Sequence, residues 1–334
     1  MSDATPEEAK KQCREWNYHP DLPIPNSPVF AWPPEPRRLA IWFKNSWFSL
    51  SERVIILGFA ILTWIYFQPP LEVCKTLGIE WVSYVYARNL ILMTVVTTAL
   101  HLYFHTWKKQ GMVKKYDPRQ LAKNNGLYNF RSQLWDNVFW TLASGVTVWT
   151  AYEVLVLWAM ANGYAPMLSW SEHPVLFVFL LFMIPIWSSF HFYWVHRLLH
   201  WPPLYKIAHS LHHRNVNVGP WSGLSMHPIE HIIYLSAALI HFVVASHPIH
   251  LFFNMQWAAL AAATSHVGFE SVVIRDKNRL NLGAFHHQLH HRYFECNYGN
   301  AEMPWDKWFG SFNDGTAAGK AMTRERLKKK IAKR

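Results

Sequence analysis

The sequence predicts an all-α integral membrane protein with about four transmembrane helices, a membrane hairpin and a His-rich cytoplasmic cap. Hydrophobic residues make up 51% of the 334 residues and 19 residues are Trp, which is rich for a soluble protein. Long apolar runs alternate with polar segments, and 16 of the 20 His residues fall between His191 and His291. The mean hydropathy of −0.03 then indicates apolar spans diluted by a polar part.

Residues 1–50 are expected to form an N-terminal cytoplasmic arm rich in Pro and Trp. The run from Pro20 to Pro36 contains too much Pro for a regular helix or a central strand. The interleaved Trp residues can pack the arm on the body of the protein or lie at a lipid interface. The first residues are partly acidic and lack an early apolar run, so we expect no cleavable signal peptide.

Residues 51–195 are expected to hold transmembrane helices 1–4 and a basic loop. The predicted spans correspond to apolar runs at 54–67, 90–104, 138–161 and 175–195. The first run is short, and Pro185 is expected to kink the fourth. The His-rich region is predicted at 196–320. It includes a fifth apolar region at 232–264, which is interrupted at 246–250 as in a membrane hairpin.

The charge of the loops predicts the orientation. The segment 108–131 carries seven Lys or Arg residues, whereas 162–174 carries none and 68–80 carries only Lys75. Loops rich in Lys and Arg stay in the cytoplasm, so the N-terminus, the His-rich segments and the C-terminus are all predicted to be cytoplasmic. The basic tail at 321–334 is expected to be a solvated helix end or to attract anionic lipid. No nucleic-acid motif accompanies the charge, so nucleic acid is not an expected partner.

Clustered His residues predict a metal centre. His residues three or four positions apart share one face of a helix. A tetrahedral zinc ion needs only four ligands, so eight candidates indicate two metal ions, and imidazole suits Zn, Cu, Fe and Ni. His227 precedes Pro228 and is expected to cap a helix, which makes His231 an inward-facing candidate. The eight strongest candidates are His196, His200, His209, His212, His213, His287, His290 and His291.

Other metal chemistries are excluded by residues that the sequence lacks. Cys13, Cys74 and Cys296 are far apart and form no paired motif, so neither a disulfide framework nor a thiolate zinc site is expected. No carboxylate has the Glu-x-x-His spacing of soluble di-iron bundles, and no HExxH motif is present. These absences disfavour a hydrolase and leave oxygen activation at a His-bound pair of irons as the best chemical interpretation.

The order of the motifs resembles a known family. HRLLH at 196–200, HSLHH at 209–213, HPIEH at 227–231, HVGF at 266–269 and HHQLHH at 286–291 are followed by NYG and WDKWFG. This order closely resembles the membrane-bound fatty acid hydroxylase and sterol desaturase superfamily. The resemblance assigns the eight candidates to three His boxes and suggests His231 and His266 as additional metal ligands. Asn297 and Tyr298 match the NYG element and Asp306 the WD element, which the resemblance suggests as support for the third box. His191 and His286 fit no box of the family and, with His227, are kept as possible additional or supporting residues.

The resemblance implies a membrane-bound di-iron oxygenase. Such an enzyme uses O2 and two electrons to hydroxylate a C–H bond of a lipid, here a fatty acyl, sphingoid, sterol or aminolipid substrate. Zinc can replace the two Fe ions in a purified sample. The chain shows no fused cytochrome b5 domain, so a separate electron donor of the ferredoxin, rubredoxin or cytochrome b5 type, with a reductase, is expected.

Two alternatives stay open. The same di-iron centre can desaturate a lipid or sterol. Hydroxylation is favoured because the HPIEH and WDKWFG variants look more like bacterial lipid hydroxylases. A metal-transporting or metal-storing membrane protein is the alternative of another class. Transporters hold ions near the bilayer midplane, whereas these His residues fall at span ends and in polar segments.

Overall fold

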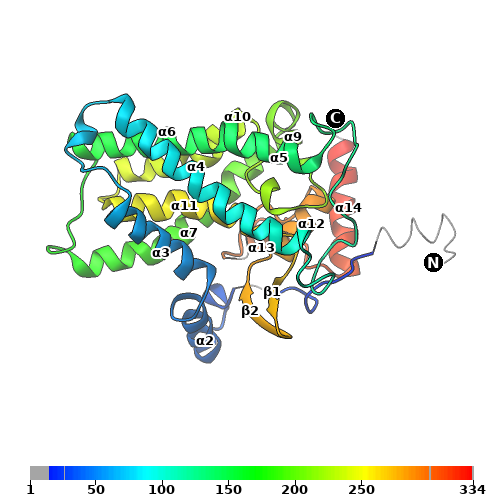
Figure 1. The fold of residues 1–334 in the computed structure, drawn as a ribbon. Helices are drawn as coiled ribbons and strands as arrows, with labels where there is room; N and C mark the ends of the chain where they lie inside the picture. Colours follow the sequence, from blue (N-terminus) through cyan, green and yellow to red (C-terminus); the bar gives the residue numbers. More distant parts are fainter. Residues whose placement is uncertain (1–14, 26, 301, 333–334) are drawn as a thin grey trace.

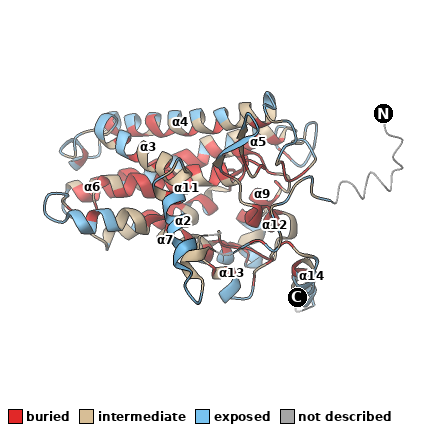
Figure 2. Cartoon of the chain, turned by 90° about the horizontal axis from the view of Figure 1, so that it is seen from below, coloured by how far each residue is buried: buried red, intermediate tan, exposed pale blue. Residues whose placement is uncertain are grey.

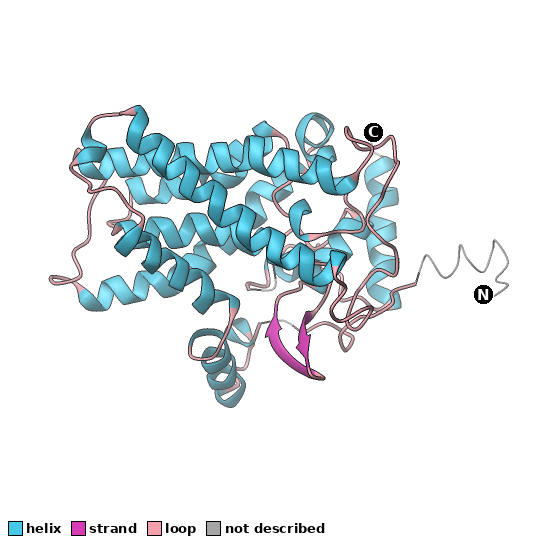
Figure 3. Cartoon of the chain, viewed as in Figure 1, coloured by secondary structure: helices cyan, strands magenta, loops and turns pink. Residues whose placement is uncertain are grey.

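The computed structural model describes residues 15–25, 27–300 and 302–332 of the chain. It is almost entirely helical, with one small two-stranded sheet at the surface (Figures 1 and 3). The predicted all-α membrane fold is therefore confirmed, and the sheet is a minor addition. The first 14 residues of the predicted arm and the last two of the predicted tail lie outside the described residues.

Among the described residues, four helical segments are long and apolar enough to cross a membrane. They match the four predicted runs, and Pro185 lies inside the last of them. The first segment is divided at residues 48–51, where the Ser51 hydroxyl caps a new helix by accepting the amide of Val54. The segments are Pro36–Tyr66, made of α2 (Pro36–Trp47) and α3 (Glu52–Tyr66); Ile79–Thr106, which begins with α4 (Ile79–His101); Gln133–Ala161, which contains α5 (Gln133–Trp140) and α6 (Val146–Ala161); and Pro174–Leu199, which is α7.

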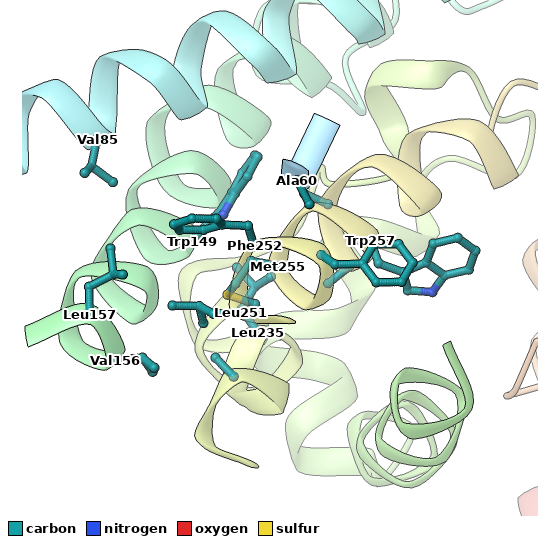
Figure 4. Packing of buried hydrophobic residues seen from close by; sticks show 14 of the residues in the cluster. Ala60, Val85, Trp149, Val156, Leu157, Leu235, Leu251, Phe252, Met255 and Trp257 are labelled. Atoms are coloured by element: carbon teal, nitrogen blue, oxygen red, sulfur yellow. The ribbon is translucent and has the colours of Figure 1, made fainter. Parts of the chain in front are cut away.

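Helix α11 (Pro248–Ser265) forms the centre of the bundle. Its residues are buried on nearly every side, and it packs against α3, α4, α6 and α7 (Figure 2). Phe252 and Met255 of this helix lie with Trp149 of α6 and Leu235 in the main hydrophobic cluster (Figure 4). An apolar helix that is surrounded by other helices in this way contributes packing contacts rather than a lipid-facing surface.

The fifth apolar region consists of two helical parts and a turn. Helix α10 (Pro228–Leu235) continues as the 3-10 helix η7 (Ser236–Phe242), and α11 begins at Pro248 after a turn at the predicted interruption. The His247 side chain accepts the amide of Ile249 and so caps α11. The two arms of the expected hairpin are thus present, and whether they cross the bilayer stays a prediction.

A polar network links α4 and α6 inside the apolar bundle. Arg88 forms a buried ion pair with Glu153, whose other carboxylate oxygen accepts the Trp149 indole N–H at 3.0 Å. Asn89 donates to Thr150 and Glu153 at 3.3 and 3.2 Å. Ionised groups are costly in lipid unless they are paired, so these contacts hold α4 against α6 in one register.

The basic loop and the His-rich segments lie at the same end of the bundle. The amide of Tyr116 donates to Gly268 at 2.9 Å, and Asn217 donates to the carbonyls of Arg119 and Gln120. At the other end, Asn162 donates to Lys75, and the amide of Ser246 donates to Pro166. The predicted arrangement, with the turn at 246–250 opposite the His clusters, therefore matches the contacts.

The cap at the His-rich end is assembled from short elements. The N-terminal arm lies on it, because Trp16 stacks under the Arg292 guanidinium, 3.4 Å from the ring centroid. A two-stranded hairpin projects from the body, and the last helix of the chain lies at the outer edge (Figure 1). The cap elements are α8 (Pro202–Leu204), η5 (Tyr205–His209), α9 (Ser210–His213), η6 (Pro220–Ser222), β1 (Ser271–Ile274), β2 (Lys277–Asn281), α12 (Phe285–Tyr293), α13 (Trp305–Trp308) and α14 (Ala317–Ile331).

Candidate metal centre

Nine His side chains converge where the cap meets the bundle. They come from the last turn of α7, from η5 and α9, from the residue after α11, and from α12. The element η5 is a π-helix, a rare widened turn that is frequent at functional sites, and it ends at His209. All nine are buried. They are His196, His200, His209, His212, His213, His266, His287, His290 and His291.

Five of these residues form the first group, which we name site A: His196, His200, His209, His213 and His290. Six of the separations between their Nε2 atoms run from 3.0 to 3.3 Å, and all five ligand atoms lie within 4.8 Å of one another. Imidazoles that bind one ion at about 2.0–2.1 Å lie roughly 2.9–3.4 Å apart, depending on the coordination angle. The spacing in site A is therefore that of a ligand shell.

The other four residues form site B: His212, His266, His287 and His291. Nε2 of His291 lies 3.0 Å from that of His266 and 3.1 Å from that of His287. Sites A and B are adjacent, since the rings of His213 and His291 lie 5.0 Å apart. Within the described residues, every candidate ligand of both sites is a histidine. The two sites can each hold a metal ion.

Hydrogen bonds at Nδ1 turn the imidazoles inward. In site A, Nδ1–H of His196 donates to the Tyr298 carbonyl at 2.6 Å and that of His290 to the Cys296 carbonyl at 2.6 Å. In site B, Nδ1–H of His266 donates to the Ala262 carbonyl at 2.7 Å. Such partners fix the tautomer and leave Nε2 as the metal-binding atom.

A carboxylate performs the same role for one ligand. Nδ1–H of His209 donates to Glu230 at 2.7 Å. Neutral rings of His196 and His209 then both carry their proton on Nδ1, so two lone pairs face each other across 3.1 Å. Two lone pairs at that distance repel unless a cation lies between them, so this arrangement suits a site that can hold a cation.

Burial keeps the imidazoles neutral. Desolvation lowers the pKa of His209 to about 3, that of His212 to about 4 and that of His266 to about 3. These rings are therefore uncharged at neutral pH, with one nitrogen free to bind metal. Desolvation raises the pKa of Glu230 to about 7, with His212 opposing the rise.

Four other His residues proposed from the sequence lie outside both sites. His231 is buried, with Nδ1 2.9 Å from the Ser144 hydroxyl and Nε2 3.0 Å from the Leu224 carbonyl. His227 caps α10, His191 bonds to Ser236 at 2.9 Å, and Nε2 of His286 lies 3.5 Å from Asp306. Both nitrogens of His231 are therefore engaged by groups other than site A or site B.

The NYG and WD motifs hold the turn that supports site A. Asp306 accepts the amides of Tyr298 and Gly299 at 2.8 Å each. Asn297 has a positive φ of 53°, and its side chain bonds to the carbonyls of His286 and Asn313. The carbonyls of this turn are those that orient His196 and His290, so these residues act on the site through the backbone.

Several supporting groups were not singled out by sequence. Glu230 lies in the HPIEH motif, one residue before His231, but no spacing in the sequence marks it as the partner of His209. The carbonyls of Ser225 and Ala262 have no sequence signal at all. A Cβ on Gly223 would lie 2.1 Å from the Ala262 carbonyl oxygen, so only glycine allows this close approach.

A cavity of about 630 Å³ opens from both sites. His196 and His209 of site A line it together with His212, His266 and His287 of site B. One face of α7 forms a wall, and apolar side chains dominate the lining near the His residues: Phe192, Val195, Leu199, Met226, Tyr234 and Ala258. The cavity can therefore hold an apolar chain or ring system beside the metal sites.

Comparison with known proteins agrees with this site. Residues 149–311 match the family model described as "Fatty acid hydroxylase". The chain is similar to the "Delta(7)-sterol 5(6)-desaturase" of Eremothecium gossypii, at 32% identity over 40% of this chain and 37% of the relative. It is also similar to the protein of that name from Candida glabrata, at 29% identity over 45% of this chain and 42% of the relative. No solved structure matches significantly.

The fold and the site define a helical integral membrane protein with two adjacent all-His sites able to bind metal. The family match over residues 149–311 and the sterol desaturase relatives support the fatty acid hydroxylase and sterol desaturase superfamily for this chain. The predicted resemblance is thereby confirmed. The chain spans about two fifths of the length of the curated relatives it matches.

Proposed function

We propose that this protein is a membrane-bound di-iron oxygenase that hydroxylates a C–H bond of a lipid. The observation that carries the proposal is the pair of adjacent all-His sites at the end of an apolar cavity. Two iron ions bound there would supply the redox chemistry that activates O2 with two electrons. We propose site A and site B as their ligand sets, with zinc as a substitute in purified samples.

The protein's own residues do the binding and positioning. Phe192, Val195 and Leu199 line one wall of the cavity and give an apolar substrate a surface next to the His rings. The carbonyls of Tyr298, Cys296 and Ala262 keep the imidazoles in one orientation before any metal binds. Burial of all nine rings limits the access of bulk water to the site.

Desaturation of a lipid or sterol is the second candidate. It is favoured by the names of the two relatives, both of which are called sterol desaturases. Both reactions need the same sites. Hydroxylation replaces one hydrogen of a carbon by a hydroxyl group, whereas desaturation removes a hydrogen from each of two neighbouring carbons and leaves a double bond. We retain hydroxylation first because the family model carries that description.

We further propose a cytoplasmic cap and a separate electron donor with a reductase. The basic loop at the His-rich end supports the orientation, because cytoplasmic loops are enriched in Lys and Arg. Metal transport is less well supported, because all nine His residues belong to the cap end of the bundle and a transporter holds its ions near the midplane.

The test is turnover by the purified full chain, reconstituted with iron, NADH, a reductase and a donor protein. Lipid extracts from cells that lack the gene serve as substrate, and products are identified by mass spectrometry. Hydroxylation adds one oxygen atom to a lipid, and desaturation removes two hydrogen atoms. If no lipid changes in an O2-dependent way, or if His212→Ala leaves turnover intact, the proposed function is wrong.

A further inference from the structure

A charged pair forms part of the cavity lining. Arg53 of α3 forms an ion pair with Glu302, and their side chains are 14% and 12% exposed. Both residues line the cavity that reaches His196 and His266. We name Arg53, Glu302, Glu52 and Ser188 the polar rim. An apolar cavity with a charged pair at one end is suited to a molecule with a polar end and an apolar body.

The polar rim has hydrogen-bonding capacity that the described residues do not use. Nε of Arg53 and the hydroxyl of Ser188 are buried, and neither has a partner among the described groups. Buried polar atoms normally have partners, because leaving one unpaired is costly. These two groups can therefore form hydrogen bonds with a ligand. The guanidinium can only donate a hydrogen bond, and the hydroxyl can donate or accept one.

The charges of the polar rim are mixed. It contains one guanidinium and two carboxyl groups, since Glu52 also lines the cavity and accepts a hydrogen bond from Thr264. An anion alone would face two carboxyl groups, and a cation alone would face the guanidinium. A head with both charges can place its anionic group at Arg53 and its ammonium group at Glu302, so that each charge is compensated.

Three indole rings complete the surroundings. The guanidinium carbon of Arg53 lies 5.2 Å from the ring centroid of Trp42, and 5.8 Å from those of Trp47 and Trp257. Indole faces attract cations, including ammonium groups. Trp42 and Trp257 also line the cavity, so they can contact a bound head as well as Arg53.

The polar rim is offset from site A along α7. Asn300 accepts hydrogen bonds from Ser189 of α7 and from the amide of Glu302. Ser189 precedes His196 by seven residues of the same helix, which corresponds to roughly 10 Å along its axis. A head held beside Ser188 and Glu302 is therefore offset from His196 along α7, and the apolar body of the same molecule can extend along the cavity toward site A.

We propose that the polar rim binds the zwitterionic head of the lipid substrate, with the anionic group at Arg53 and the ammonium group at Glu302. This inference rests on the proposed function, because it assigns the substrate class of the same cavity. It makes Arg53 and Glu302 specificity-determining residues that do not touch the reacting atoms.

The experiment is a binding competition without O2 or electron donor, so that an inactive enzyme does not affect it. The full chain in an uncharged detergent is mixed with three lipids that share one palmitoyl chain, and native mass spectrometry compares the bound amounts. The lipids are lysophosphatidylethanolamine, which is zwitterionic, lysophosphatidic acid, which is anionic, and monopalmitoylglycerol, which is neutral. We expect the zwitterion to bind roughly tenfold or more tightly than the neutral lipid.

The variant Arg53→Met with Glu302→Leu removes both charges together, which is often neutral for folding. It should bind the three lipids about equally. Arg38→Gln is the matched control, because Arg38 pairs with Glu35 at the surface, and it should keep the wild-type preference. The inference would be overturned if the wild type bound all three lipids equally, or if it bound the anionic and the zwitterionic lipid equally. It would also be overturned if the double variant kept the preference for the zwitterionic lipid.

Discussion

At the scale of single residues, the imidazoles of sites A and B are held through their second nitrogen. His spacing along the chain predicted eight of the nine converging rings, and the family resemblance added His266. The sequence could not identify Glu230 as the partner of His209, because the two are 21 residues apart and no motif joins them. His231 has the spacing of a ligand, but the Ser144 hydroxyl, supplied by a distant helix, engages its ring.

Replacing Glu230 with Gln should lower the affinity of site A for its metal ion. Gln keeps the shape and an acceptor for His209 but loses the negative charge, and changes to such supporting groups typically cost 10–100-fold in metal affinity. The measurement is a chelator titration of the purified protein. In the variant, the metal bound at site A should be released at a lower chelator concentration than in the wild type.

His227→Asn serves as the control, since Asn also caps helices and His227 lies outside both sites. Its titration should match that of the wild type. Unchanged release in Glu230→Gln would show that the carboxylate does not support site A.

At the scale of elements, apolar run length predicted the four spans and the turn before α11. The division of the first span at 48–51 was not predicted, because a Ser cap inside an apolar region is a weak signal against a continuous helix. The small sheet was also not predicted, since β1 and β2 have four and five residues and their packing depends on the basic loop. The burial of α11 on all sides needs the three-dimensional arrangement.

The intramembrane ion pair gives a prediction for α4 and α6. Glu153→Leu leaves Arg88 buried without its carboxylate and should cost about 3–5 kcal/mol of unfolding free energy. Arg88→Met combined with Glu153→Leu should recover stability close to that of the wild type. Denaturant unfolding in detergent measures both.

Glu72→Gln is the matched control, because its ion pair with Lys75 is exposed and should contribute about 0–1 kcal/mol. If Glu153→Leu were as stable as this control, the network would not join the two helices. The double variant should also keep the metal content of the wild type, since the pair lies outside both sites.

At the scale of the whole molecule, loop charge correctly grouped the segments by the end of the bundle at which they lie. The basic loop contacts the His-rich cap, and the turn at 246–250 contacts the loop at 162–173. The sequence therefore predicted the relative placement of the loops. Charge bias supplies the orientation in the membrane, which stays a prediction.

Thiol labelling tests that orientation. Lys109→Cys lies in the exposed basic loop and Tyr164→Cys lies in the exposed loop at the opposite end. Each is made with Cys13→Ser, and Cys74 and Cys296 are buried. In intact cells, a membrane-impermeant reagent should label the cysteine at 164 and spare the one at 109 until the membrane is opened. The reverse pattern would contradict a cytoplasmic cap.

The metal content of the purified, iron-supplied full chain tests the central claim most directly. The structure predicts two metal ions per chain in the wild type, because sites A and B are separate sets of converging nitrogens. His290→Ala removes a ligand of site A and His266→Ala one of site B, so each variant should lose at least one ion, with His227→Asn retaining two. Fewer than two ions in the wild type, or two ions in both Ala variants, would contradict a two-metal centre.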